Sequence, residues 1–589
     1  MNRFLRYMRR VLAFGFGAWA LLFFLDIRHV MPNMFHGLFH VQVVSALVAG
    51  SIGILVVIAL LTLLFGRIYC STLCPLGILQ DVILRCKKWW IRLRYKRTSL
   101  RIKYSSACNV LRYAILGAVS LLFAAGITLP LAWLDPYSNF GRIATTLFRP
   151  VVVWVNNLLA QGFNAMNNFS LFVVPQLDPA WGVLAFAAVL LVVLIVMVWR
   201  RERLWCNTIC PVGAALSLLS RVSLFRVSID RTACNACALC TMGCKSECID
   251  SKAGTVDASR CVTCYNCLNA CTRNAIHYRP DGWKYGRKVA SIPCDAAENI
   301  LSSVAQQEET SLQPLLYRTE QGEMIDSRQL ARRRFIKGSL LTLGALAAGS
   351  AVGQPWAQNK RGGGSSGRGL DRGTCKGNTT GCGRGHSACE GCKKECGRDC
   401  LHERTVYPLP PGAVSRERFI QKCTACQLCV SKCPTHVLQP AFLENGVMGM
   451  MQPYMRFKVK NYCNYECTVC SAICPTHAIT PLTLEDKKLT RVGMAYFVKR
   501  ACIVFTAHQD CGACAEHCPT AAVHMIPFRD GLMIPEMRPE YCIGCGGCES
   551  ICPVLPVAIF VQGLDRQERA VPPSIDKFDA DPNDFGFGF

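Results

Sequence analysis

Cys423-Thr-Ala-Cys426-Gln-Leu-Cys429-Val-Ser-Lys-Cys433-Pro434 is the stretch that decides the fold of the C-terminal part of this chain. Its four cysteines are separated by two, two and three residues. This spacing supplies three thiolates to one cubane [4Fe–4S] cluster and a fourth thiolate to a neighbouring cluster. Structural zinc more often uses two separated Cys-x2-Cys pairs, and disulfide scaffolds are short secreted chains. The run therefore predicts an α+β domain of the bacterial-ferredoxin type.

Related runs recur along the 589 residues, and each C-terminal copy ends in Cys-Pro. Such self-similarity is an internal repeat of a half-ferredoxin unit. In the first two runs the crossed rule assigns Cys244 to the second cluster and Cys271 to the first. Adjacent and nested pairing both remain open for the C-terminal runs. The six predicted ligand sets are Cys234, Cys237, Cys240 and Cys244; Cys261, Cys264, Cys267 and Cys271; Cys423, Cys426, Cys429 and Cys433; Cys463, Cys467, Cys470 and Cys474; Cys502, Cys511, Cys514 and Cys518; and Cys542, Cys545, Cys548 and Cys552.

The first 205 residues are strongly apolar, and 51% of the whole chain is hydrophobic. Stretches of this length and composition are typical of bilayer-spanning helices. The segment 151–174 is also apolar but rich in asparagine, which favours an interfacial or extramembrane helix. We expect an α-helical membrane bundle with four spans, Val11–Asp26, Val43–Phe65, Leu111–Leu134 and Trp181–Trp199.

The net charge of +26 follows from the same topology. Nine Lys or Arg and no acid lie between Arg85 and Lys103, directly after an apolar segment. Basic loops of this kind face the cytoplasm. The basic flanks before Val11 and after Trp199 agree with that orientation, so the N-terminus is expected inside. No nucleic-acid partner is needed to explain the charge.

An export-type signal lies in the middle of the chain. Arg332-Arg333-Arg334-Phe335-Ile336-Lys337 precedes a weakly apolar run, Gly338–Val352. Twin arginines before such a run are typical of a Tat signal. The simpler interpretation is a short amphipathic or buried helix. With the Tat interpretation the segment is a retained fifth span, and the C-terminal clusters lie in the periplasm.

Two further cysteine pairs share a different motif. Cys70-Ser-Thr-Leu-Cys74-Pro-Leu-Gly follows the second span, and Cys206-Asn-Thr-Ile-Cys210-Pro-Val-Gly follows the fourth. The matched copies favour a shared metal or cluster site, or a dithiol–disulfide pair. The alternative is that proline and glycine end the helices and the cysteines merely pack.

Other residues carry weaker signals. The spacing of Cys375, Cys382, Cys389, Cys392, Cys396 and Cys400 fits no ferredoxin motif, so disulfides and a metal site both stay open. Cys86, Cys108, Cys248 and Cys294 are isolated and are assigned no role. Quinol oxidation releases protons, so His or Asp near the outer membrane face are candidate acceptors. Those candidates are His29, His36, His40 and Asp135, with Asp26 nearby.

Several cofactors are not expected. There is no Cys-x2-Cys-His for covalent c-type haem, and no dinucleotide fingerprint that would indicate a flavin or NAD module. We therefore divide the chain into a membrane domain with both Cys-x3-Cys-Pro motifs (1–205), a two-cluster cytoplasmic ferredoxin (206–290), a linker (291–330), a Tat-like anchor (331–357), a Gly/Arg/Cys-rich insert (358–410), a four-cluster polyferredoxin (411–562) and a tail (563–589).

With these residues in hand, the chain resembles two proteins joined. Residues 1–290 resemble the NapH membrane ferredoxins of periplasmic nitrate-reductase systems and their relatives in methylamine utilisation. Residues 330–560 resemble the Tat-exported NapG ferredoxins. The resemblance implies a quinol dehydrogenase of anaerobic respiration in the cytoplasmic membrane, which passes electrons from menaquinol to a periplasmic c-type cytochrome or reductase. The alternative is a membrane ferredoxin that serves copper-enzyme maturation or regulation.

Overall fold

The computed structural model describes residues 2–27, 31, 37–95, 104–105, 108–174, 180–280, 316–318, 324–326, 404–458 and 461–573. Contacts divide the chain into two units, Met1–Gly286 with Cys396–Phe589, and Arg287–Glu395. The second unit contributes one described hairpin, of β5 (Leu316–Arg318) and β6 (Met324–Asp326). The Tat-like segment at 332–352, the cysteines at 375–400, His29, His36 and Cys294 lie outside the described residues.

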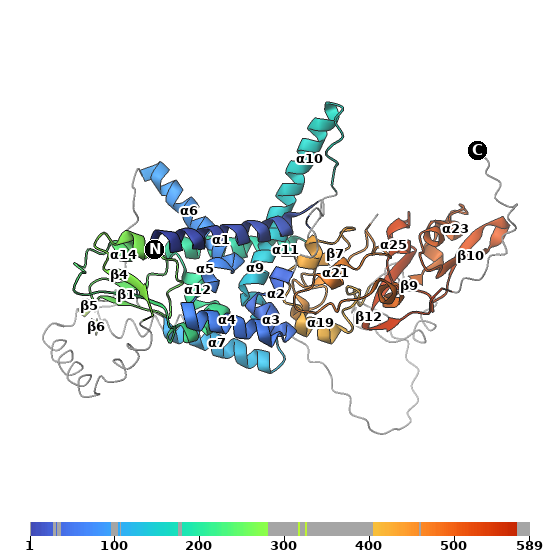
Figure 1. The fold of residues 1–589 in the computed structure, drawn as a ribbon. Helices are drawn as coiled ribbons and strands as arrows, with labels where there is room; N and C mark the ends of the chain where they lie inside the picture. Colours follow the sequence, from blue (N-terminus) through green and yellow to red (C-terminus); the bar gives the residue numbers. More distant parts are fainter. Residues whose placement is uncertain are drawn as a thin grey trace, which may run out of the picture. The chain divides into compact units, whose positions relative to one another are not determined.

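The N-terminal part of the first unit is helical (Figure 1). Three stretches in the described part of the chain are long and apolar enough to cross a membrane: Phe4–Leu25, Pro136–Ala165 and Trp181–Arg200. They correspond to α1, to α9 with η2 and α10, and to α11. The helices are α1 (Asn2–Leu25), α2 (Gly37–His40), α3 (Val43–Ala49), α4 (Ile52–Phe65), α5 (Tyr69–Thr72), α6 (Pro75–Tyr95), α7 (Asn109–Ala124), α8 (Leu129–Leu134), α9 (Pro136–Ile143), η2 (Ala144–Phe148), α10 (Arg149–Ala165), α11 (Trp181–Arg200), α12 (Leu204–Thr208) and α13 (Pro211–Ser220).

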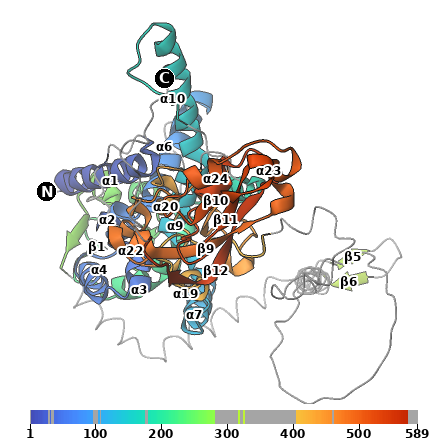
Figure 2. The same ribbon diagram turned by 90° about the vertical axis from the view of Figure 1, so that its right-hand side faces the viewer.

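The second and third predicted spans are shorter than expected. Gly50 ends α3 with a left-handed φ of 77°, and α4 begins two residues later. A residue without Cβ adopts this conformation at little cost, so the helix divides there. The third segment keeps 16 helical residues in α7. Figures 1 and 2 both show α10 projecting from the other helices.

A small α+β domain follows at 226–279, which we call the N-terminal ferredoxin domain. Its outer strands β1 and β4 pair antiparallel from Arg226↔Arg279 to Ile229↔Ile276. Two one-turn helices carry cysteines between the strands, and a hydrophobic core surrounds those cysteines. The elements are β1 (Arg226–Ile229), α14 (Leu239–Met242), β2 (Ile249–Asp250), β3 (Thr255–Val256), α15 (Asn266–Ala270) and β4 (Ile276–Arg279).

Residues 404–573 form the C-terminal ferredoxin domain, in which short helices and two-stranded sheets alternate. Its longest sheet pairs β9 with β12, and the register shifts between Gly563 and Glu568. Figure 2 shows this sheet beside the β10–β11 hairpin. The elements are α19 (Arg416–Lys422), α20 (Leu428–Ser431), β7 (Leu438–Pro440), η5 (Val447–Gly449), β8 (Pro453–Met455), α21 (Val469–Ala472), α22 (Leu484–Leu489), β9 (Thr490–Phe497), η6 (Lys499–Ala501), α23 (Ile503–Thr506), α24 (Ala513–Glu516), β10 (Val523–Pro527), η7 (Arg529–Gly531), β11 (Met533–Met537), α25 (Gly547–Ile551) and β12 (Ile559–Arg569).

Candidate electron-transfer centres

The N-terminal ferredoxin domain places Cys244 with the three leading thiols of the second run, as the crossed rule predicts. Burial raises the pKa of Cys267 well above its usual value, and the charges of Cys264, Cys261 and Cys244 raise it further. The fourth cysteine of the first run therefore lies beside the second run. Cys240 lies within electrostatic range of Cys234 in the other group.

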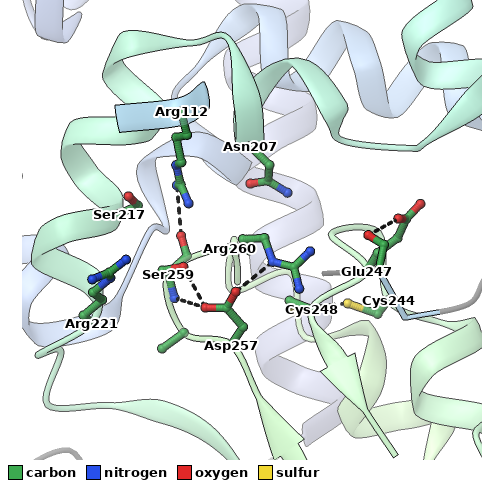
Figure 3. Close-up of polar contacts among 12 residues, drawn as sticks. Arg112, Asn207, Ser217, Arg221, Cys244, Glu247, Cys248, Asp257, Ser259 and Arg260 are labelled. Atoms are coloured by element: carbon green, nitrogen blue, oxygen red, sulfur yellow. Dashed lines mark hydrogen bonds and ion pairs between the residues drawn. The ribbon is translucent and has the colours of Figure 1, made fainter. Parts of the chain in front are cut away.

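Cys248, to which no role was assigned, lies beside the crossed group. Its side chain is 1% exposed, and its sulfur is 3.5 Å from the sulfur of Cys244. The hydrogen bond from Cys248 lowers the pKa of Cys244. Figure 3 shows the two cysteines together. The sequence offered no signal for this contact, because an isolated cysteine most often fills space in a core.

The four C-terminal runs combine as adjacent pairs, which the sequence had left open. Cys474 lies with the three leading thiols of the preceding run, and Cys433 lies with those of the following run. One cavity is lined by Cys433, Cys463, Cys467 and Cys470, and another by Cys502, Cys511, Cys514 and Cys552. The four thiol groups are Cys423/Cys426/Cys429/Cys474, Cys433/Cys463/Cys467/Cys470, Cys518/Cys542/Cys545/Cys548 and Cys502/Cys511/Cys514/Cys552.

These four groups lie in sequence along the C-terminal domain. The first two groups are built from the same two cysteine runs, which exchange their fourth cysteines, and the last two groups are built in the same way from the other two runs. The backbone joins the middle groups, because the amide of Cys463 donates to the carbonyl of Cys545 at 2.9 Å. The group that contains Cys426 touches helix α9, since Cys426 belongs to the same apolar core as Tyr137 and Phe140.

The backbone around the thiols fits a buried anionic cube. In the runs with two-residue gaps, the residues on both sides of the second cysteine have positive φ. Alternating left-handed residues turn successive N–H groups toward one concave face, which suits an anion. Most of them are not glycine, so the conformation costs free energy that a bound group can offset. The pairs are Ala236 and Ala238, Thr263 and Tyr265, Ala425 and Gln427, and Gly544 and Gly546.

Burial alone would keep these thiols protonated. It raises the pKa of Cys426 to about 12 and that of Cys429 well above its usual value. A thiolate in such a place needs a positive partner, and iron supplies one. No group of three or more His, Cys, Asp or Glu in the described ranges is arranged for a single metal ion. Ligands of a cubane surround four iron atoms, so they need not converge on one point.

Cys70, Cys74, Cys206 and Cys210 form a second kind of site, which we call the tetrathiol centre. Each of the four side chains is 4% exposed, and all four belong to one apolar core. Helices α5 and α12 end at Thr72 and Thr208, and Pro75 and Pro211 then begin α6 and α13. The sulfurs of Cys74 and Cys210 accept the amides of Gly77 and Gly213 at 3.4 and 3.3 Å. Each motif thus combines an N-cap sulfur with proline in the first turn.

Two buried arginines link the two motifs, because each arginine donates a hydrogen bond to a backbone carbonyl of the other motif. Arg67 precedes the first motif and donates to the carbonyl of Cys206 at 3.1 Å. Arg203 precedes the second and donates to the carbonyl of Cys70 at 3.2 Å. Each also lies near the sulfur of its own motif, at 3.8 and 3.9 Å. The sequence carried the signal, an arginine three residues before the first cysteine of both copies, and our prediction missed it.

Asp81 connects three elements beside this centre. Its carboxylate contacts Arg9 of α1 at 2.9 Å, Arg203 at 2.6 Å and Lys245 at 2.8 Å. Burial by itself raises the pKa of Asp81, but the charges of Arg203, Lys245 and Arg9 outweigh it and lower the pKa far below its usual range. The carboxylate therefore stays ionised.

The N-terminal ferredoxin domain is fixed to the helices through the segment before Cys261. The carbonyl of Ser259 accepts Arg67 at 3.0 Å and Arg112 at 3.1 Å. Figure 3 shows Arg112 of α7 directed at Ser259, with Asp257 holding Ser259 and Arg260 below. Val262 and Cys264 reach the core that contains the tetrathiol centre.

The candidate proton acceptors Asp135, Asp26 and His40 lie near the C-terminal ferredoxin domain and have structural partners. Asp135 caps α9 and accepts the amide and hydroxyl of Ser138 at 2.9 and 2.6 Å. Asp26 pairs with Lys432 of the C-terminal ferredoxin domain at 2.6 Å. The rings of His40 and His477 lie 5.6 Å apart. These residues line the contact between the helices and the first C-terminal thiol group.

These features define a ferredoxin-type iron–sulfur electron-transfer protein. A family model described as a 4Fe-4S binding domain matches residues 47–97 and 180–230, and a 4Fe-4S dicluster model matches 501–555. The first model thus covers both Cys-x3-Cys-Pro motifs.

The NapH-type resemblance is confirmed by curated relatives. The chain is 26% identical to the ferredoxin-type protein NapH of Escherichia coli, over 38% of this chain and 65% of that protein. It is 27% identical to the methylamine utilization ferredoxin-type protein MauN of Methylobacillus flagellatus, over 41% and 71%. It is 28% identical to NapF of Escherichia coli, over 25% and 79%. The chain thus spans about two thirds of the NapH protein. No solved structure matches.

Proposed function

We propose that the protein is the electron-transferring part of a quinol dehydrogenase, which carries electrons from menaquinol to a periplasmic c-type cytochrome or reductase. In this proposal the chain lies in the cytoplasmic membrane, with the N-terminal ferredoxin domain in the cytoplasm and the C-terminal domain in the periplasm. The three apolar helices and the NapH-like relatives are consistent with a membrane protein. The six thiol groups would each hold one [4Fe–4S] cluster, which supplies one-electron transfer.

One observation carries the proposal. A single apolar core contains Cys264 of the N-terminal ferredoxin domain, all of the tetrathiol centre, and Cys426 of the C-terminal domain. Sulfur ligands from both ferredoxin domains therefore meet the same packed interior. A chain that only anchored soluble partners would not need this continuity. The core keeps water out between the groups, and the C-terminal groups continue from Cys426 in series.

The tetrathiol centre is the natural link in this series. We propose that its four thiols form a redox centre between the two ferredoxin domains. The buried guanidinium groups of Arg67 and Arg203 would balance thiolate charge there, because each lies near one sulfur. The match of the 4Fe-4S binding model to both motif regions supports a resident group.

The geometry supports the alternative function, copper-enzyme maturation, less well than it supports electron transfer. A metal-delivery site has to release its ion to a partner, yet each of the four thiols is 4% exposed. Copper bound at high affinity and passed to an apo-enzyme by the full-length protein would favour this alternative.

The test uses the full-length protein in liposomes under anaerobic conditions. Menaquinol-4 should bleach the visible absorbance of the oxidised iron–sulfur clusters, and dithionite gives the full amplitude for comparison. A spectrum that stays oxidised with menaquinol-4 while dithionite reduces it would contradict the proposal. A Cys70→Ser/Cys206→Ser variant should keep the reduction of the N-terminal clusters and lose that of the C-terminal ones.

A further inference from the structure

A cavity of about 330 Å³ lies between α1 and α6. Its volume is within the range of small-molecule sites. It is distinct from the outer-face residues His40 and Asp135, which the sequence suggested for quinol chemistry. Pro75, the residue after Cys74, lines it, as do Phe140 and Phe148.

The cavity is elongated and apolar. The α1 wall is formed by a stripe at helical spacing from Arg10 to Leu21, which spans about 16 Å at 1.5 Å per residue. Ala13 and Ala18 present small side chains along this stripe, and Gly17 lets Ile78 of α6 pack close to α1. At the flanks Phe14 is 72% exposed and Val82 is 45% exposed. These flanks face lipid if α1 spans the membrane, so a lipid-soluble molecule could enter from the side.

One end of the cavity is polar. Arg9, Arg10, Asp81 and Arg85 line it, and Arg9 is paired with Asp81. Arg9 is 4% exposed, and its Nε has no hydrogen-bond partner within the described part of the chain. A buried donor without a partner costs free energy, which an oxygen acceptor in the cavity would recover.

The polar end is joined directly to the N-terminal ferredoxin domain. Asp81 holds Lys245, the residue that follows the thiol of Cys244. Helix α1 packs against α15, which carries Cys267, and Arg10 lies within electrostatic range of Cys264. A molecule with its head at Arg9 and Asp81 would therefore lie beside the thiol group Cys244/Cys261/Cys264/Cys267.

We propose that this cavity binds the menaquinol, with the ring at the Arg9–Asp81 end and the isoprenoid tail along the α1 stripe. The inference rests on the proposed function and gives it a site. An anionic phospholipid would also suit arginines beside an apolar groove. The direct link from the polar end to a thiol group favours a redox-active head, because a structural lipid has no use for that link.

The oxidation of menaquinol at the polar end of the cavity releases two electrons and two protons, and each has a destination. Menaquinol loses two electrons and two protons and becomes menaquinone. A cluster held by Cys244, Cys261, Cys264 and Cys267 would accept the two electrons one at a time and pass each one on. Asp81 stays ionised and accepts a hydrogen bond from the quinol hydroxyl. Arg10 and Arg85 favour the deprotonated quinol, and the protons leave to water at the exposed Arg85.

The test fills the cavity from both walls. Ala18→Phe and Val82→Trp add volume inside it, whereas Gly15→Phe adds the same ring on α1 where a new Cβ meets open space. Equilibrium binding of menaquinone-4 to the full-length protein is measured for each variant. Iron content and the amplitude reduced by dithionite report whether the clusters are intact. We expect both filling variants to weaken binding at least tenfold, with iron content unchanged, and Gly15→Phe to bind like wild type.

Equal binding in all variants would overturn the inference. So would a wild-type protein that binds no menaquinone-4 but retains about one cardiolipin or phosphatidylglycerol, lost from the Ala18→Phe variant, since the cavity would then be a lipid site. If wild type binds menaquinone-4 but is not reduced by menaquinol-4, the proposed direction of electron flow fails. A tenfold loss of binding in Ala18→Phe would in that case still support the cavity as the quinone site.

Discussion

Gly77 and Gly213 occupy equivalent places in the two halves of the tetrathiol centre, and neither has room for a side chain. A Cβ at Gly77 would lie 2.5 Å from the carbonyl oxygen of Cys70 and 2.9 Å from Arg203. At Gly213 the matching distances are 2.3 Å to Cys206 and 2.9 Å to Arg67. We expect Gly77→Ala and Gly213→Ala each to destabilise the protein by about 1–3 kcal/mol, because overpacking forces backbone and guanidinium apart.

The melting temperature of the detergent-solubilised protein measures this effect. Gly53→Ala is the matched control, since Gly53 is helical and a Cβ there meets nothing within 4 Å. It should melt at or slightly above the wild-type temperature, because alanine favours a helix. Equal melting of all three variants would contradict the close approach at the tetrathiol centre.

Cys248 offers a second residue-scale prediction, on the potential of one cluster. Its hydrogen bond to Cys244 stabilises charge on that sulfur, and such bonds raise the reduction potential of iron–sulfur centres. A hydrogen bond of about 1 kcal/mol corresponds to about 40 mV for one electron. Cys248→Ala should therefore lower one cluster potential by up to about 40 mV in an EPR-monitored titration.

Iron content separates this role from direct ligation. The Cys248→Ala variant should keep the iron content of the wild type, as should the control Cys86→Ala at an exposed position. A loss of about four iron atoms from Cys248→Ala would mean that Cys248 is itself a ligand.

At the scale of elements, each C-terminal thiol group takes its fourth cysteine from the neighbouring run. Cys423→Ser and Cys474→Ser lie in different runs but in one thiol group, so both should remove the same cluster. Cys433→Ser and Cys463→Ser, as separate variants, should both remove the cluster of the second thiol group. EPR spectra of the reduced variants should therefore match within each pair and differ between pairs. Spectra that match by run, Cys423 with Cys433, would contradict the crossed arrangement.

The sequence predicted which cysteines are ligands better than it predicted which runs share a cluster. Each run declares three ligands by local spacing, because one tight turn places them around a cube. The fourth ligand depends on how two runs pack, and adjacent or nested packing gives the same spacing. The arginine exchange was harder still, since Arg67 reaches Cys206 across 139 residues. Hydropathy located α1 and α11 but missed the division at Gly50, where a single left-handed residue ends α3.

At the scale of the whole molecule, the described thiol groups lie one after another in a series of packed contacts. From Cys264 the apolar core leads to the tetrathiol centre and on to Cys426. From Cys426 the crossed pairs lead through Cys463 and Cys545 toward the group that contains Cys511. The contact between the N-terminal helices and the C-terminal ferredoxin domain is therefore the point at which the two halves of this series meet.

Arg142 holds that contact, and its loss should separate the two sides. The guanidinium is fully buried and donates to the carbonyls of Ala425 and Thr424 at 3.1 and 3.0 Å, on either side of which lie Cys423 and Cys426. Arg142→Met leaves both carbonyls unpaired, and truncating one side of a buried charged hydrogen bond typically costs about 2–5 kcal/mol at an interface. We expect the C-terminal clusters to be reduced by menaquinol-4 at least tenfold more slowly in stopped-flow measurements.

The N-terminal clusters should be reduced at the wild-type rate in this variant, and dithionite should reduce every cluster, because the ligands themselves are untouched. Arg416→Met is the matched control: its partners Asp565, Asn445 and the carbonyl of Tyr407 all lie within the C-terminal ferredoxin domain, so the interface remains. A tenfold delay in both variants would indicate general damage to that domain. Unchanged rates in Arg142→Met would mean that electrons enter the C-terminal domain by another route, because this contact would then have no part in transfer.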